Sequence, residues 1–132
     1  MREERKTPHI LSVSYDESLL RTREMLLQRE GYLVISALGF SDAVEQCKNA
    51  EFDLFVLGHS IPGNDKRELI RTFRARCDAP VLALHRHGEN VPEEADAHAY
   101  PDDVEGFLKA ISKLLTRQRP PKKDDGLYNS AT

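Results

Sequence analysis

The chain has 132 residues, of which 39% are hydrophobic and 31% charged, and its formal net charge is −3 at pH 7. This length suits one domain with its own core. Both charge signs are interspersed, which argues against general binding to nucleic acid or to membrane surfaces. No apolar run approaches the length of a membrane span, and the charged residues 1–7 do not resemble a signal peptide. Composition therefore predicts a cytoplasmic domain, with Cys47 and Cys77 as free thiols rather than a disulfide or zinc motif.

Short apolar stretches alternate along the chain with segments of helical periodicity. In chain order we expect a strand at 9–13, a helix at 18–30, a strand at 32–35, a short helix after 41, a strand at 52–57, a helix at 66–76, strands at 80–84 and 97–100, and a helix at 103–115. Gly31 should stop the first helix. The residues expected to cap helix N-termini are Ser18, Ser41, Asp65 and Asp103.

Alternating strands and helices predict a parallel sheet with right-handed crossovers and helices on both faces. The expected fold is a doubly wound, five-stranded α/β domain over residues 9–116. Residues 1–8 would be an N-terminal extension and residues 117–132 a flexible tail. Only nine residues separate His85 from Ala95, too few for a full crossover helix with its turns. The fourth helix of the series should therefore be short or missing.

Ligands of open α/β sheets bind outside the carboxyl ends of the strands, where the winding reverses. The residues to consider are those that directly follow the first, third, fourth and fifth predicted strands. They are Ser14, Tyr15 and Asp16, then Gly58 and His59, then His85, then Tyr100.

Four segments, at 10–32, 52–63, 79–85 and 95–101, resemble the corresponding segments of the response-regulator receiver (CheY-like) domain. They occur in the family's order and at matching spacing, and the resemblance covers about residues 8–116. It implies a flavodoxin-like receiver fold and a role in signal transduction through a two-component, phosphorelay-type pathway.

The resemblance also implies where a phosphorylation site would lie. In the family, two acidic residues after the first strand and an aspartate after the third hold Mg²⁺, and that aspartate accepts the phosphoryl group. A Thr or Ser after the fourth strand and a Lys after the fifth bind it. Hard cations require such oxygen ligands, and the charge of the transferring group must be neutralised. The corresponding residues here are Ser14 and Tyr15, Gly58, His85 and Tyr100, and only the neighbouring Asp16 keeps a carboxylate.

The resemblance therefore predicts a receiver domain that cannot be phosphorylated, has no catalytic activity or cofactor, and acts through a protein partner. Formation of a homodimer is left open at this point. An alternative is a sensor that binds a ligand at Tyr15, His59 and His85, or a metal at His59, His85 and Asp16. A further alternative is the N-terminal receiver part of a longer regulator. Tyr15 and Tyr100 could plug the vacated pocket or simply be half-buried at the strand ends.

Overall fold

The computed structural model describes residues 7–89 and 92–117. The extension expected at 1–8 and the tail expected at 117–132 therefore lie almost wholly outside the described residues. The strands are β1 (His9–Ser14), β2 (Leu33–Leu38), β3 (Leu54–Leu57), β4 (Val81–Leu84) and β5 (Ala97–Ala99). The helices are α1 (Glu17–Arg29), α2 (Phe40–Asn49), α3 (Gly63–Arg76) and α4 (Val104–Arg117).

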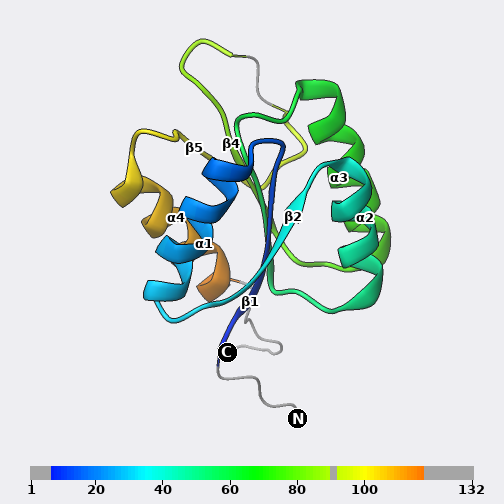
Figure 1. The fold of residues 1–132 in the computed structure, drawn as a ribbon, viewed down its shortest axis with the longest axis horizontal. Coiled ribbons are helices and arrows are strands. Elements are labelled where there is room, and N and C mark those ends of the chain that lie inside the picture. Colours follow the sequence, from blue (N-terminus) through cyan, green and yellow to red (C-terminus); the bar gives the residue numbers. More distant parts are fainter. Residues whose placement is uncertain (1–6, 90–91, 118–132) are drawn as a thin grey trace, which may run out of the picture.

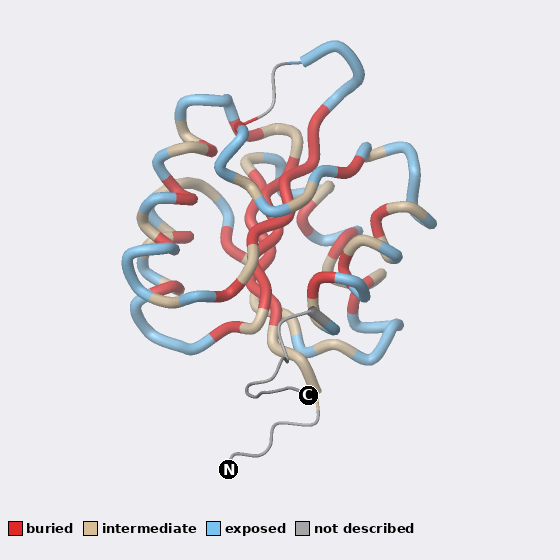
Figure 2. Tube along the Cα trace, turned by 180° about the vertical axis from the view of Figure 1, so that it is seen from behind, coloured by how far each residue is buried: buried red, intermediate tan, exposed pale blue. Residues whose placement is uncertain are grey.

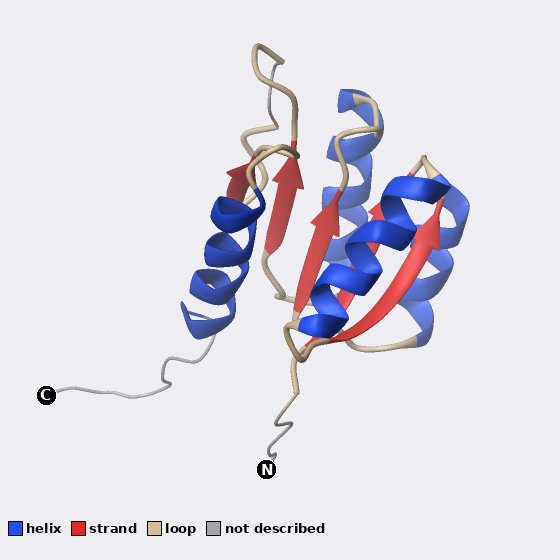
Figure 3. Ribbon diagram, turned by 60° about the vertical axis from the view of Figure 1, so that its left-hand side comes forward, coloured by secondary structure: helices blue, strands red, loops and turns tan. Residues whose placement is uncertain are grey.

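The strands form one parallel sheet in the order β2-β1-β3-β4-β5. Helices α2 and α3 cover one face of the sheet, and α1 and α4 cover the other (Figures 1 and 3). The winding reverses between β1 and β3, so the carboxyl ends of these strands mark the expected ligand position. The predicted doubly wound α/β fold is confirmed.

The central strands β1, β3 and β4 are buried on both faces, as Figure 2 shows by the red centre of the tube. Alternate strand residues point to opposite faces, so the core divides into two clusters. Leu11, Phe55 and Val81 face α2 and α3 and pack with Leu69 and Phe73. On the other face, the strand and helix residues that pack together include Ile10, Leu54, Val56, Leu82, Leu27, Phe107 and Ile111.

Several predicted helix starts are wrong. Helix α1 is capped by Asp16, whose carboxylate accepts from the backbone N–H of Leu19 at 3.1 Å, and not by Ser18. Helix α2 begins before Ser41, at Phe40, after Gly39 with φ 94°; glycine suits that left-handed conformation because it has no Cβ.

Of the last two predicted helix caps, Asp65 is wrong and Asp103 is confirmed. Asp65 does not cap α3, since this helix starts at Gly63 and Asp65 lies in its first turn. Asp103 does accept from the Gly106 backbone N–H at 3.0 Å, at the start of α4, as predicted.

The connection from β4 to β5 differs from the other connections of the sheet. Its described residues, 85–89 and 92–96, contain turns and bends but no helix. The expectation that the fourth helix of the series is short or missing is confirmed for these residues. In Figure 1 this connection projects beyond the carboxyl ends of the strands.

Candidate functional site

The sheet brings the residues expected to replace the phosphorylation site to one edge. The Gly58 backbone N–H donates to the Val13 carbonyl at 2.9 Å, which ties the end of β3 to the end of β1. The His85 backbone N–H donates to the Ala99 carbonyl at 3.1 Å, which ties the end of β4 to β5. Ser14, Gly58, His85 and Tyr100 thus lie along this edge in the order that the prediction requires.

Gly58 is buried, and the space beside it is occupied by an arginine. A Cβ at position 58 would lie 3.0 Å from Nη1 of Arg23 and 3.1 Å from the Val13 carbonyl oxygen. The Arg23 guanidinium therefore lies where a side chain at this position would begin. Arg23 is 8% exposed, and its Nη1 has no hydrogen-bond partner among the described residues. Burial lowers the pKa of Arg23, which leaves a desolvated cation beside Gly58, the residue expected to replace the phosphoacceptor.

Ser14 is fully buried, and its hydroxyl is engaged with its surroundings. Its Oγ lies 3.0 Å from both the backbone nitrogen and the carbonyl oxygen of Asp16, and 3.1 Å from Oγ of Ser60. Ser60 in turn accepts from the Tyr15 backbone N–H at 3.0 Å. This network joins the loops that follow β1 and β3 through neutral hydroxyls, at residues expected to replace the family's metal-binding acidic pair.

Tyr15 does not plug the vacated pocket. Its hydroxyl donates to Oδ2 of Asp65 at 2.7 Å, and its partly buried ring packs against the cluster on the α2–α3 face. Burial raises the pKa of the Tyr15 hydroxyl, and the hydrogen bond and charge of Asp65 raise it further. The half-buried alternative is the correct one, because the hydroxyl turns toward α3 and not toward Ser14.

Tyr100 belongs to an aromatic group around His85. The ring centroids of Tyr100 and His85 are 4.9 Å apart with edge-on geometry, and His87 stacks on Tyr100 at 3.8 Å. His98 approaches the other side of His85, at 5.6 Å. Tyr100 remains 37% exposed, so it partly covers the end of β4 without filling the space beside Gly58.

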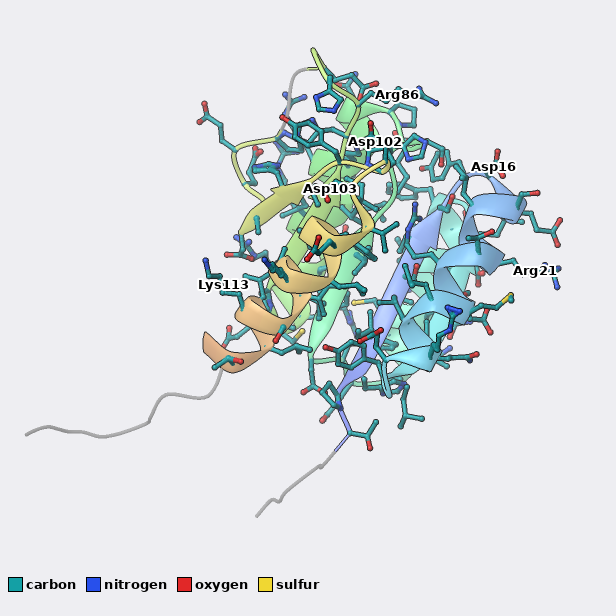
Figure 4. All side chains as sticks on the ribbon, turned by 90° about the vertical axis from the view of Figure 1, so that its left-hand side faces the viewer. Asp16, Arg21, Arg86, Asp102, Asp103 and Lys113 are labelled. Carbon is teal, nitrogen blue, oxygen red and sulfur yellow. The ribbon has the colours of Figure 1, made fainter. Side chains whose placement is uncertain are left out.

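The structure does not assemble the alternative metal site. In the part of the chain that the structure describes, no group of three or more His, Cys, Asp or Glu side chains could hold a metal ion. Asp16 is engaged as the α1 cap, and Figure 4 shows it at the start of that helix, apart from the loop that carries Arg86. His59, His85 and Asp16 are therefore not a ligand set in this structure.

Basic residues that sequence reasoning missed dominate this edge. Lys66 is 3% exposed, and its Nζ donates to the Leu84 carbonyl at 2.7 Å. Burial is the main cause that lowers the pKa of Lys66. The spacing of apolar residues along each helix could have indicated that these basic side chains are buried. Arg23 lies on the buried stripe of α1 with Leu20 and Leu27, and Lys66 shares the stripe of Leu69, Ile70 and Phe73 on α3.

No family model matches the chain, but curated relatives do. PetR of Rhodobacter capsulatus is 32% identical over 117 residues, which are 83% of this chain and 49% of PetR. The transcriptional regulatory protein ResD of Bacillus subtilis is 30% identical over 94 residues, 71% of this chain and 39% of ResD. The chain thus spans half or less of the length of these relatives.

Solved structures share the fold. A two-component response regulator from Clostridium difficile superimposes with a TM-score of 0.76 at 16% identity, covering 86% of this chain and all of that one. The N-terminal domain of a response regulator/sensory box/GGDEF protein from Carboxydothermus hydrogenoformans has a TM-score of 0.70 at 25% identity, over 83% of this chain and 94% of that one. No helix in the described ranges is long and apolar enough to cross a membrane. The order of the sheet and these likenesses identify the chain as a response-regulator receiver (CheY-like) domain, the module of two-component signalling.

Proposed function

We propose that this receiver domain does not accept a phosphoryl group and that it signals through contacts with a protein partner. The observation that carries the proposal is the replacement of the phosphoacceptor by Gly58, with the Arg23 guanidinium beside it. Glycine offers no nucleophile. A buried cation also repels Mg²⁺, on which phosphoryl transfer depends for charge neutralisation.

The other residues of this edge support the same proposal. Ser14 and Tyr15 supply no carboxylate, and their hydroxyls already have partners. The remaining acid, Asp16, has its carboxylate directed to the N-terminus of α1. Mg²⁺ binds carboxylate and phosphate oxygens with near-octahedral geometry, and this edge presents no such set of oxygens among its described residues.

Incubation with acetyl phosphate and Mg²⁺ followed by intact mass measurement tests the first part. We expect no added phosphoryl mass and no Mg²⁺-dependent movement of the Ser14, Gly58 and His85 amide signals on titration with beryllofluoride. The response regulator TrrA of Thermotoga maritima, solved in complex with Mg²⁺ and BeF, is the positive control for the titration. A phosphorylated peptide, or joint saturable shifts at this edge that require Mg²⁺, would contradict the proposal.

Contact with a protein partner is supported by the mode of action of the class and by exposed apolar side chains. Tyr100 is 37% and Val104 50% exposed, next to each other in space at the start of α4, where they line a small apolar cavity of about 130 Å³. Sedimentation of the chain and of a Val104→Glu variant over a range of concentrations tests the homodimer. A concentration-dependent dimer that the variant abolishes would support self-association at this place, and a monomer throughout would leave a different protein as the partner.

A further inference from the structure

A hollow of about 500 Å³ lies beside the degenerate site, between the loop after β3, the first turn of α3 and the loop after β4. Its lining carries more positive than negative side chains, with Lys66, Arg67 and Arg86 against Glu89. The family's acidic site would attract cations here. In this chain the charge of the same edge is inverted.

The cationic groups differ in how firmly they are held. Lys66 is almost fully buried, and its bond to the Leu84 carbonyl fixes the ammonium next to the hollow. An ammonium has three N–H donors, so the bond to Leu84 leaves others for a ligand. Arg86 is exposed on the loop after β4, at the upper end of the molecule in Figure 4. Its guanidinium forms no recorded hydrogen bond or ion pair with another described residue, whereas Arg67 lies 4.0 Å from Glu94.

Helix α3 adds a positive potential of its own. It begins at Gly63 without a side-chain cap, and Pro62, Gly63 and Asn64 line the hollow. The first N–H groups of a helix lack partners within the helix, and together with the helix dipole they attract anions. The α3 N-terminus and the flanking cations thus both contribute positive potential to the hollow.

His59 lies within this positive potential. It lines the hollow, and its Nδ1 is buried without a hydrogen-bond partner among the described residues. Burial lowers the pKa of His59, and the positive charges of Arg86, Arg23 and Lys66 lower it further, against the smaller opposing effect of Glu89. An anion that enters the hollow would oppose these positive charges and favour the protonated imidazole, so it would raise the pKa of His59.

We propose that this hollow binds a small molecule bearing a phosphate group, directly and without Mg²⁺. The arginine guanidinium and lysine ammonium are the side chains that bind phosphate oxygens most strongly, as charge-assisted donors. The volume lies within the range of small-molecule sites, which leaves room for an organic group beside the phosphate. Recognition is non-covalent, so it goes beyond the proposed function and needs neither an aspartate nor a metal.

The test is an amide NMR titration of the whole chain in buffer with a chelator and no Mg²⁺. Inorganic phosphate and glycerol phosphate are titrated separately, which distinguishes free phosphate from a phosphomonoester. Both Arg86→Gln and Glu89→Gln change exposed side chains, so neither should disturb folding. Arg71→Gln is the matched control, because Arg71 is an exposed arginine of α3 that does not line the hollow.

We expect saturable shifts of the His59, Lys66 and Arg86 amides with at least one probe, and a rise in the pKa of His59 on binding. Arg86→Gln should weaken binding by about tenfold, the loss of one charge-assisted hydrogen bond. Glu89→Gln should strengthen binding by about two- to fivefold, as expected of one exposed charge, and Arg71→Gln should change nothing. Linear, unsaturable shifts, or equal weakening by Arg71→Gln and Arg86→Gln, would overturn the proposal. Either result leaves the acetyl phosphate experiment, and the function it tests, unaffected.

Discussion

The position of the Arg23 guanidinium predicts an unusual response to substitutions at Gly58. An alanine Cβ would lie 3.0 Å from Nη1 of Arg23 and 3.1 Å from the Val13 carbonyl oxygen. The arginine end can move aside but the backbone carbonyl cannot, so Gly58→Ala should destabilise the fold by about 1–3 kcal/mol, as overpacking does. Gly58→Asp brings the same crowding and adds a carboxylate directly beside a buried, uncompensated cation.

The size of the charge effect follows from that geometry. A carboxylate at position 58 would lie about 4 Å from the guanidinium, where opposite charges attract by about 4 kcal/mol at an effective dielectric constant of about 20. Loss of hydration of the new carboxylate opposes this gain. We therefore expect a coupling free energy of about 2–4 kcal/mol between Gly58→Asp and Arg23→Met. With Arg23 present, Gly58→Asp should be less destabilising than Gly58→Ala, and with Arg23→Met this order should reverse.

Urea unfolding followed by far-ultraviolet circular dichroism measures the required free energies, since the chain contains no tryptophan for fluorescence. The set comprises the parent, both Gly58 variants, Arg23→Met and the two double variants. Additivity within about 0.5 kcal/mol is the behaviour of independent sites. Additive costs would mean that the guanidinium does not occupy the space beside Gly58, and would remove the support that Arg23 gives to the proposed function.

Further predictions concern other residues of the same edge. Ser14→Ala should lower the free energy of unfolding by about 0.5–1.5 kcal/mol, because it removes the hydrogen bonds of the buried Ser14 hydroxyl to Ser60 and to the Asp16 backbone; unchanged urea unfolding would contradict this. Lys66→Met should cost about 1.5–3 kcal/mol in the same assay, through the lost bond to the Leu84 carbonyl. The lowered pKa of His59 means that the unfolded chain binds more protons just below about pH 6.5. Stability should therefore be full above this pH and fall on acidification. His59→Gln should reduce that slope but not abolish it, because burial also lowers the pKa of His98.

The sequence was sufficient to predict the fold because its strongest signals are local. Near-continuous apolar runs such as 54–57 predict strands covered on both faces, and the short 86–94 interval left no room for a helix. The helix starts were less predictable. Asp16 and Ser18 are both good capping residues and lie only two positions apart, and only the backbone conformation selects Asp16.

The position of the site could be predicted from the sequence, but its basic side chains could not. Ser14, Gly58, His85 and Tyr100 could be placed at one edge because parallel strands share the direction of their carboxyl ends. The basic side chains could not be placed, because Arg23 and Lys66 reach this edge from helices rather than from strand ends. A basic residue on a helix is usually taken as exposed. Here its helical spacing from buried apolar residues was the better indicator of burial.

The positive charge at the carboxyl ends of the strands distinguishes between two ways in which a receiver domain could lack phosphorylation. Simple loss of the acidic residues would leave a neutral site that a few substitutions could restore. Here Arg23 occupies the space beside Gly58, and Lys66 is fixed to the end of β4. An aspartate introduced at Gly58 would pair with Arg23 before it could bind Mg²⁺, because the guanidinium is already in place and the other acidic ligands are missing. Under the proposed function, restoring phosphorylation would therefore require removal of the cation as well as return of the acids, and a site arranged in this way is better suited to an anion than to a metal.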